Sequence, residues 1–468
     1  MQMQKPVIGF LPLYVELYDL TVPEIRPDLD AFHEEVVKRL QEKGLEVINV
    51  PVCRLASEFA SAVQKFKEQD VDVVVTLHLA YSPSLESEKA LASVEVPIII
   101  LDTTPAYVYD QNTDDDALMK NHGIHGVQDM CNLLVRNKKI FKIFAGHIDH
   151  SDVLDRVAQA ARTAMMVHTM KHSRVGMAGE PFHGMGDFQE DFSEMEKNLG
   201  IQTVPYDFAK ADEIIKSVTP EELQKEYEAD AEHFEIDPEL PREVYDRSTK
   251  VCLAVRHWIE ENRLTAFTIN FLETEKDKPG LPVMPFTECC KAMERGIGYA
   301  GEGDVLTAAF TGALLSGYPE VTFTEMFCPN WRDGSVFLSH MGEFNYRVAD
   351  GKPVLQEKPF PFTSADNPTV AYRTMKPGRA VFANLAPFGD GRYRMTLASG
   401  TMLKIEGPNK MEKAVNGWFK PDIPLENFLE QLSERGGTHH SVLVYGDEIE
   451  SLSLFADFLG VEKIILTE

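Results

Sequence analysis

The chain has 468 residues, 44% of them hydrophobic and 26% charged, which is ordinary for a globular protein of two or three domains. It carries 46 lysines and arginines against 74 aspartates and glutamates, a formal net charge of −28. This acidic balance argues against nucleic acid or an anionic membrane as a partner, since both attract basic surfaces. No apolar run approaches the ~20 residues of a membrane helix. Six scattered cysteines without a CxxC pair indicate a reduced, cytoplasmic protein.

Residues 6 to about 150 alternate short apolar runs with helical patterns. The run that begins at Val7 is interpreted as a first strand and not as a signal peptide, because acidic residues follow it at once. Further strands are predicted at residues 46–50, 71–76 and 96–101. Helices are predicted at residues 30–43, 55–69 and 84–93. Strands that alternate with helices predict a parallel sheet covered on both faces, which binds ligands at the carboxyl ends of its strands.

His78 stands directly after one of these predicted strands. It is interpreted as a hydrogen-bonded structural histidine, with a ligand-facing side chain as the alternative. No glycine-rich phosphate loop follows the first strand, so a nucleotide site is not expected.

A second α/β unit begins near Arg162. Its strands are predicted at residues 173–178 and 265–271, and a long amphipathic helix at 242–262. The acidic stretch at residues 220–239 is interpreted as a solvated helical face with a loop.

From about residue 321, short runs of β-branched and aromatic residues alternate with turns, which predicts an antiparallel barrel or sandwich. Its strands are predicted at residues 336–338, 344–348, 370–374, 380–383, 392–397 and 401–405. A last α/β piece follows, with helices at 425–435 and 449–459 and strands at 441–445 and 463–466. The expected fold is two doubly wound parallel-sheet domains and a C-terminal, mainly antiparallel β-barrel, with domains at residues 1–160, 161–320 and 321–468.

Glu302 lies in the stretch Ala300-Gly-Glu-Gly-Asp304, directly before a predicted helix. Its small neighbours let the backbone approach a ligand closely, and Asp304 is placed to cap the helix. We expect this loop-to-helix junction to hold a working carboxylate.

Further carboxylate and imidazole groups follow downstream: Glu325, His340, His439 and His440. Such a mixed set suits a divalent ion such as Mn²⁺, Co²⁺ or Zn²⁺. No short ligand motif links these stretches, so spacing alone leaves open the alternative of unrelated loop residues. Cys328 is interpreted as a core cysteine, with a soft metal ligand as the alternative.

The stretches Ala300–Asp304, Ser339-His-Met341 and Gly436-Gly-Thr-His-His440 resemble three signature segments of the L-arabinose isomerase family, in the family's order. The resemblance is close from about Thr265 to Tyr445 and looser before. It implies a metal-dependent aldose–ketose isomerase that moves a carbonyl between C1 and C2 of an open-chain sugar through an enediol. Mn²⁺ is the expected cofactor, with Co²⁺ as the alternative.

The resemblance also implies individual roles. The metal ligands carried over from the family are Glu302, Glu325, His340 and His440. The two glutamates are also the expected catalytic acid and base. The expected substrate contacts are His439, His125, Phe271, Met185 and Leu13. For His125, in Asn121-His-Gly-Ile-His125, the alternative is a residue that merely begins a helix.

One position departs from the family: Leu11 stands where a glutamine is offered to the sugar, with Glu16 nearby as a substitute. The alternatives are therefore an epimerase or isomerase of a modified or deoxy sugar, or a non-catalytic sugar-binding protein on the same scaffold. A metallohydrolase is not expected, because the chain has no HExxH motif. The family's first domain reaches into a neighbouring subunit, which implies a homo-oligomer, trimer or hexamer, with shared active sites.

Overall fold

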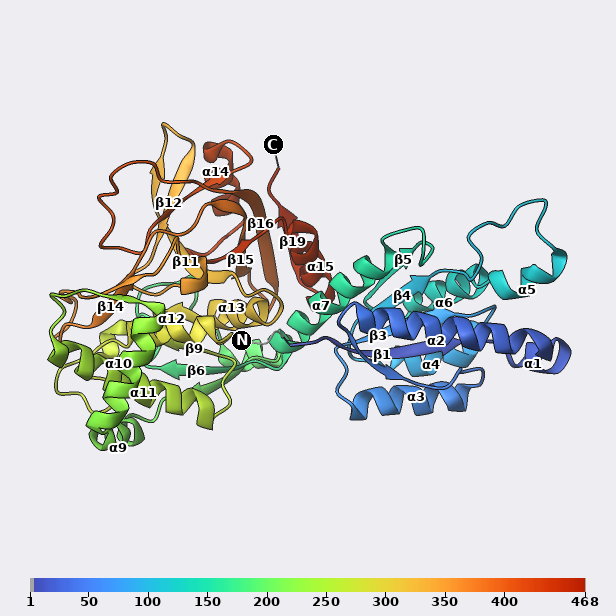
Figure 1. The fold of residues 1–468 in the computed structure, drawn as a ribbon, viewed down its shortest axis with the longest axis horizontal. Helices are drawn as coiled ribbons and strands as arrows, with labels where there is room; N and C mark the ends of the chain where they lie inside the picture. The colour runs from blue at the N-terminus through green and yellow to red at the C-terminus, as the bar shows by residue number, and fades with distance from the viewer. Residues whose placement is uncertain (1–3, 468) are drawn as a thin grey trace. The chain divides into compact units, whose positions relative to one another are not determined.

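The structure is a computed structural model that describes residues 4–467, and the chain divides into two compact units. The N-terminal unit holds residues 4–168 and 457–460, and the C-terminal unit holds residues 169–456 and 461–467. Figure 1 labels their helices and strands. Among the residues described, no helix is both long and apolar enough to cross a membrane.

The N-terminal unit is built on one parallel sheet with strand order β2-β1-β3-β4-β5. Its strands are β1 (Val7–Leu13), β2 (Glu46–Asn49), β3 (Val73–His78), β4 (Ile98–Asp102) and β5 (Phe141–Ala145). Its helices are α1 (Glu16–Thr21), α2 (Arg26–Glu42), α3 (Ala56–Glu68), α4 (Ser84–Ala92), α5 (Leu118–Asn121) and α6 (Ile124–Arg136), with short 3₁₀ helices η1 (Pro23–Ile25) and η2 (Asp115–Ala117). This is a doubly wound sheet, as predicted.

The alternation of side chains in β1 divides its residues between the two faces of the sheet. On one face Phe10 stacks against His33 of α2. On the other face Leu11 and Leu13 join the core formed with α3, α4 and α6. Both leucines are fully buried.

The C-terminal unit contains a second parallel sheet, with strand order β10-β9-β6-β7. Its strands are β6 (Arg174–Ala178), β7 (Gln202–Pro205), β9 (Ala266–Ile269) and β10 (Gly298–Gly301). Its helices are α8 (Phe192–Leu199), α9 (Phe208–Ser217), α10 (Pro220–His233), α11 (Arg242–Glu261), α12 (Phe286–Glu294) and α13 (Val305–Gly317), with the 3₁₀ helix η3 (Phe271–Glu273). Helix α7 (Val153–Lys171) precedes β6.

A closed antiparallel barrel completes this unit, as predicted. Its six strands run in the order β15-β18-β11-β12-β17-β16, and pairing of β15 with β16 closes it. The strands are β11 (Val321–Asn330), β12 (Ser335–Ser339), β15 (Gly378–Pro387), β16 (Tyr393–Met402), β17 (Gly417–Pro421) and β18 (His440–Tyr445). Helices α14 (Leu425–Glu434) and α15 (Ile449–Leu459) follow β17 and β18, and β19 (Glu462–Ile465) pairs in parallel with β16.

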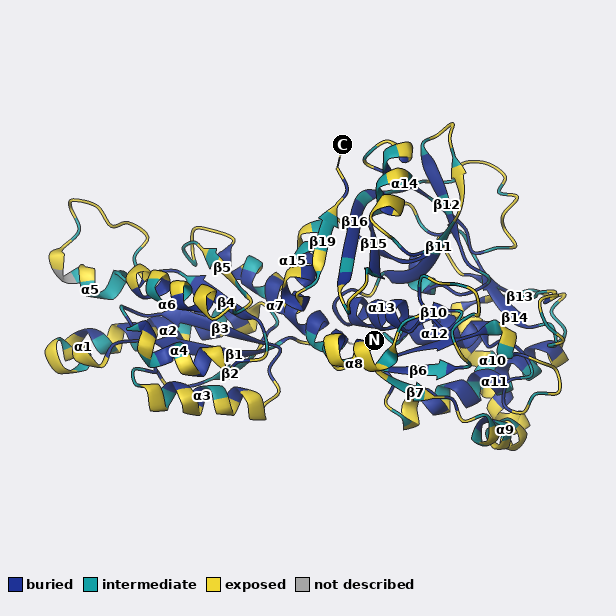
Figure 2. Ribbon diagram, turned by 180° about the vertical axis from the view of Figure 1, so that it is seen from behind, coloured by how far each residue is buried: buried dark blue, intermediate teal, exposed yellow. Residues whose placement is uncertain are grey.

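Helix α13 joins the second sheet to the barrel. All of its residues are buried, and it contacts both the parallel strands and the barrel strands β11, β15 and β18. Figures 1 and 2 show it as a layer between the two. A helix that is apolar on all sides is expected to be buried on all sides, as α13 is here.

Four strand predictions were wrong. Residues 392–397 and 401–405, predicted as two strands, form the single strand β16, which ends at Met402. Residues 344–348 include a 3₁₀ helix, η4 (Tyr346–Val348), and no strand, because Asn345 accepts a hydrogen bond from the backbone N–H of Arg347 and begins a turn. Strand β14 (Thr369–Tyr372) lies outside the barrel, in a small sheet with β13 (Val354–Glu357) and β8 (Glu235–Ile236). Strand β18, assigned to a separate α/β piece, is a barrel strand, since antiparallel partners flank it on both sides.

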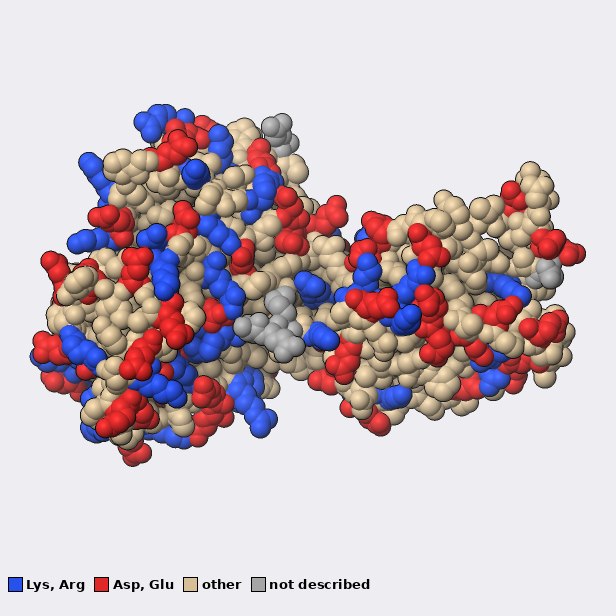
Figure 3. All heavy atoms as spheres, in the orientation of Figure 1, with Lys and Arg blue, Asp and Glu red and all other residues tan. Residues whose placement is uncertain are grey.

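The acidic stretch at residues 220–239 is only partly solvated. Asp230 of α10 is buried, where it pairs with Lys291 of α12 and accepts a hydrogen bond from the Tyr245 hydroxyl at 2.8 Å. Elsewhere acidic and basic side chains intermix over the face drawn in Figure 3.

Candidate active site

The carboxyl end of β10 delivers Glu302. The strand ends at Gly301, and α13 begins three residues after Glu302. Asp304 caps that helix as predicted, because its Oδ1 accepts the backbone N–H of Thr307 at 2.9 Å. Glu302 therefore stands at a rigid strand-to-helix turn.

The backbone of Glu302 is left-handed, with φ of 64°, a conformation that a glutamate rarely adopts. Its N–H donates to the Ile269 carbonyl at 3.0 Å, and its carbonyl accepts the N–H of Phe182 at 2.8 Å. Such strain persists where the surroundings hold it, and it concentrates at functional sites.

Three neighbouring barrel strands deliver the other predicted ligands. Glu325 on β11 lies opposite His440 on β18 and opposite Ser339 on β12. His340 follows Ser339 directly. Antiparallel pairing thus brings together residues that are far apart in the sequence.

The structure brings the side chains of the four predicted ligands together in two overlapping groups. The His440 Nε2 atom lies 3.9 Å from Glu302 Oε2, and the His340 Nε2 atom lies 4.0 Å from Glu325 Oε2. Two groups have ligand atoms within 4.8 Å of one another and can hold a metal ion, and His440 belongs to both. The groups are Glu302, His439 and His440, and Glu325, His340 and His440.

Buried carboxylates orient the two imidazoles that are expected to bind the metal. Glu343 Oε2 lies 2.7 Å from His340 Nδ1, and Asp304 Oδ2 lies 3.0 Å from His440 Nδ1. Each contact occupies Nδ1 and leaves Nε2 to face the other ligands, an arrangement typical of metal-binding histidines.

The donor set fits a divalent cation. Among residues 4–467, His440 Nε2 and Glu302 Oε2 are buried without a hydrogen-bond partner. Buried polar atoms in native proteins almost always have a partner, and a bound cation would supply one for both. Two carboxylates and two imidazoles suit Mn²⁺, Co²⁺ or Zn²⁺. Cys328 is exposed and belongs to neither group, so it is not the buried core cysteine of the sequence interpretation.

Aromatic rings pack around the imidazoles. Phe188 stacks on His440 with centroids 5.4 Å apart and planes 4° apart, and Phe323 presents its ring edge-on to both His340 and His440. These contacts restrict the rotamers of the two histidines.

The same neighbours set the ionisation of the site. Burial alone would lower the pKa of His340, but Glu343, Glu325 and Glu302 together raise it above its ordinary value. Burial alone would raise the pKa of Glu343, but His340 and Tyr299 lower it. For Glu302, burial likewise acts to raise the pKa, and the surrounding histidines lower it below its ordinary value.

Asn384 holds the turn that carries the double histidine. Its buried amide donates to the carbonyls of Thr438 and His440 at 3.0 and 2.8 Å, and its Oδ1 accepts the Thr438 N–H at 3.2 Å. The sequence analysis missed Asn384 and Glu343, because neither stands in a stretch with a ligand pattern. The spacing of Glu343, three residues after His340, was the one signal available.

A Gly301→Ala substitution is expected to weaken metal binding and turnover by about 10- to 100-fold, as loss of a metal ligand's support does. An added Cβ would lie 2.9 Å from His340 Cε1 and 3.2 Å from its Nε2, so the ring must move. Mn²⁺ titration and steady-state kinetics measure the effect, and thermal unfolding checks the fold. Wild-type metal affinity in the variant would contradict the placement of His340 in the site.

Two predicted substrate contacts lie at the same edge of the sheet as Glu302. Phe271 follows β9, with its ring 5.6 Å from Phe182 and 5.8 Å from Phe362. Met185 is half-buried in the loop after β6, and its N–H donates to the Phe182 carbonyl at 3.2 Å. The strand order reverses at β6, because β7 lies on one side of it and β9 on the other. Doubly wound sheets bind ligands at such a point, beyond the carboxyl ends of the strands.

The remaining predicted contacts, Leu13 and His125, belong to the N-terminal unit. Leu13 is fully buried in that unit's core. His125 is exposed on α6, with its ring 5.6 Å from that of His122. His122 in turn stacks on Tyr18 and shares a hydrogen bond of 2.7 Å with its hydroxyl.

The interpretation of His78 as a hydrogen-bonded histidine was only half right. Its ring is buried, and burial lowers its pKa to about 3. Within the described chain, however, neither ring nitrogen has a hydrogen-bond partner. The ring packs instead against α6, where a Cβ at Gly126 would lie 2.4 Å from His78 Cδ2.

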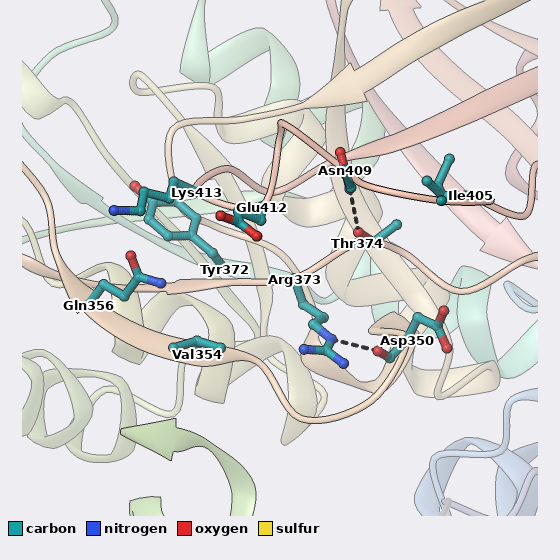
Figure 4. A pocket seen from close by; sticks show the side chains of 11 residues that line it. Asp350, Val354, Gln356, Tyr372, Arg373, Thr374, Ile405, Asn409, Glu412 and Lys413 are labelled. Atoms are coloured by element: carbon teal, nitrogen blue, oxygen red, sulfur yellow. Dashed lines mark hydrogen bonds between the residues drawn. The ribbon is translucent and has the colours of Figure 1, made fainter. Parts of the chain in front are cut away.

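A separate cavity of about 300 Å³ lies between the β13–β14 strands and the loop at residues 405–413 (Figure 4). Its charged lining residues are Asp350, Arg373, Glu412 and Lys413. Arg373 Nε donates to the Asp350 carbonyl at 2.6 Å. The cavity includes none of the predicted site residues.

A parallel α/β sheet joined to a closed barrel, with carboxylates and imidazoles converging between them, defines a class of enzyme that binds polar small molecules at strand ends. Comparison with known proteins identifies the family within this class. The sequence model of the L-arabinose isomerase central domain matches residues 179–316, and that of the L-arabinose isomerase C-terminal domain matches residues 320–462. The chain therefore belongs to the L-arabinose isomerase family and is an aldose–ketose isomerase by class.

Individual relatives extend the similarity to the whole chain. L-arabinose isomerase of Aeromonas salmonicida (strain A449) is 24% identical over 489 residues, spanning 100% of this chain and 95% of that protein. The enzyme of Shouchella clausii (strain KSM-K16) is 24% identical over 479 residues, with 99% and 94% covered. That of Bacillus subtilis (strain 168) is 24% identical over 417 residues, with 86% and 82% covered.

Proposed function

We propose that this chain is a divalent-metal-dependent isomerase that interconverts an aldose, L-arabinose or a close relative, with its ketose. The observation that carries the proposal is that Glu302, Glu325, His340 and His440 fall into two overlapping ligand groups that share His440, with Glu302 Oε2 and His440 Nε2 buried and unpartnered in the described chain. The choice of sugar is supported by the similarity to L-arabinose isomerases.

Each residue has a definite task in this proposal. Glu302, Glu325, His340 and His440 hold the metal, which when bound supplies Lewis-acid stabilisation of negative charge on the sugar's oxygens. Mn²⁺ is the proposed metal, with Co²⁺ as the alternative. His439, Phe271 and Met185 position the open-chain sugar beside the ligands.

The two glutamates share the proton transfers. One carboxylate oxygen accepts the proton from C2 of the aldose while the O2 hydroxyl proton moves to O1, which gives an enediolate. The other carboxyl then delivers a proton to C1, which leaves the carbonyl at C2, and proton exchange with solvent restores the two carboxyl groups. A hydride shift from C2 to C1 would use the same residues. Substrate deuterated at C2 separates the two routes, because proton transfer exposes the label to exchange with water and a hydride shift retains it.

Dialysis against a chelator is expected to abolish ketose formation, and Mn²⁺ is expected to restore it. The assay is a panel of aldoses and deoxy sugars, with L-arabinose among them, read out as ketose. Turnover that survives complete metal removal would contradict the proposal. Sugar binding without turnover of any aldose in the presence of Mn²⁺ would support the sugar-binding alternative.

The identity of the sugar depends on more than the metal site. Leu11, which replaces a glutamine of the family, is fully buried in the core of its unit and offers no polar group to a ligand. A site that lacks this amide should select differently among hydroxyl patterns. This favours including epimers and deoxy sugars in the panel.

We further assign the N-terminal unit to oligomerisation, with the exposed His125 serving the site of a neighbouring subunit in a trimer or hexamer; Leu13, fully buried in the core, presents no surface to that site. The unit's exposed large hydrophobic side chains support this assignment: Leu17, Leu20, Tyr107, Val108 and Tyr109. The proposed domain limits are residues 1–160, 161–320 and 321–468. The absence of disulfides among the six cysteines supports a cytoplasmic location.

A further inference from the structure

The loop that follows β6 contacts three separate parts of the candidate site. The Phe182 N–H donates to the Glu302 carbonyl at 2.8 Å, and the Phe188 ring stacks on His440. Between these two residues, Asp187 reaches His439, which is 252 residues further along the chain. The loop therefore joins the parallel sheet to the barrel at the site itself.

One carboxylate oxygen of Asp187 accepts two hydrogen bonds from His439. The His439 backbone N–H lies 3.0 Å from Asp187 Oδ2, and His439 Nδ1 lies 2.6 Å from the same oxygen. Because one atom restrains both the backbone and the ring, the imidazole is fixed about both of its side-chain torsions. Hydrogen bonds to an ionised carboxylate are also stronger than neutral ones.

This contact decides which imidazole nitrogen faces the site. With Nδ1 occupied, His439 Nε2 is left 3.7 Å from Glu302 Oε2. That Nε2 is buried and has no hydrogen-bond partner in the described part of the chain. A buried nitrogen without a hydrogen bond destabilises the folded protein, so an oxygen atom of a ligand is its expected partner.

We infer that Asp187 is a positioning residue, which aligns His439 so that its Nε2 binds an oxygen of the open-chain sugar beside Glu302. The inference rests on the proposed isomerase function of the same site. Alignment matters because a misplacement of about 1 Å can cost on the order of a hundredfold in rate. Asp187 acts only through His439 and touches neither substrate nor metal.

A double-mutant cycle in the full-length chain with saturating Mn²⁺ tests this coupling. Asp187→Ala is expected to lower kcat about 10- to 100-fold, as removal of an orienting carboxylate does. The double variant Asp187→Ala/His439→Ala is expected to be no slower than His439→Ala alone, because Asp187 has nothing else to orient. Asp187→Asn, which keeps one acceptor oxygen, is expected to recover most of the loss.

Two further measurements exclude a general loss of structure. Mn²⁺ affinity and thermal unfolding are expected to be unchanged in Asp187→Ala. The matched control is Glu196→Gln on α8, an exposed acidic residue near the loop, which is expected to keep wild-type kinetics. Independent, multiplicative effects of the Asp187 and His439 substitutions on kcat would overturn the inference, as would a wild-type kcat in Asp187→Ala.

The same cycle, repeated on the binding of L-arabinitol by calorimetry, separates this inference from the proposed function. A chain that converts no aldose but shows non-additive effects on polyol binding would refute the isomerase proposal and leave the role of Asp187 standing. An active enzyme with additive effects, or a chain whose polyol binding ignores both substitutions, would refute the role of Asp187.

Discussion

His440→Ala is expected to lower ketose formation by at least about a thousandfold and to abolish tight Mn²⁺ binding. His440 is the residue common to both candidate ligand groups, and its Nδ1 is already engaged by Asp304 at 3.0 Å. Removing the ring deletes a metal ligand and leaves Asp304 buried without its partner. Both changes weaken metal binding, and without the metal the enzyme loses its Lewis acid. Metal titration and steady-state kinetics measure the two effects.

The matched control for this variant is His257→Ala. His257 is half-exposed on α11, where its ring lies 3.8 Å from Glu261. Its removal is expected to leave kinetics, metal affinity and thermal unfolding at wild-type values. Retention of tight Mn²⁺ binding in His440→Ala would remove the basis of the four-ligand site.

Glu288→Gln is expected to destabilise the C-terminal unit by about 3–5 kcal/mol, as breaking a buried ion pair does. The Glu288 side chain is fully buried, and it accepts hydrogen bonds from Arg256 at 2.8 Å and from Arg295. A glutamine removes the charge that balances these two cations. Calorimetry is expected to show a fall in Tm of roughly 6–15 °C.

The control changes a glutamate on a neighbouring helix. Glu261 of α11 pairs with Lys210 at the surface, so Glu261→Gln is expected to leave Tm close to the wild-type value. High salt should leave the difference between the two variants in place, because a buried pair is screened little. Equal Tm values for the two variants would show that the Glu288 network adds nothing to stability.

Much of the fold followed from local pattern. Alternating apolar runs and helical stretches predicted both parallel sheets, because this alternation is typical of a doubly wound sheet in any structural context. Bounds agreed closely for α11, predicted at 242–262 and found at Arg242–Glu261, and for α15, found at Ile449–Leu459 as predicted. Both helices carry periodic apolar faces within their own sequence.

Errors arose where a long-range contact overrode the local pattern. The acidic stretch that ends near residue 239 looked solvated, yet Asp230 is buried because Lys291, 61 positions away, neutralises it. Strand β18 has the sequence of any buried strand, and only its partners β11 and β15 make it part of the barrel. No local signal carries the identity of a partner strand.

Sequence by itself determined the kinds of chemical group at the site and the turn before a helix that presents Glu302, because residue type and periodicity are local properties. Only the tertiary structure decided that Glu302, Glu325, His340 and His440 meet, and which carboxylates hold the imidazoles. Asp187 and Asp304 act through contacts of 2.6 and 3.0 Å that close between the sheet and the barrel. Such contacts exist only once the chain has folded, since packing, and not spacing in the sequence, sets the distances between side chains from different elements.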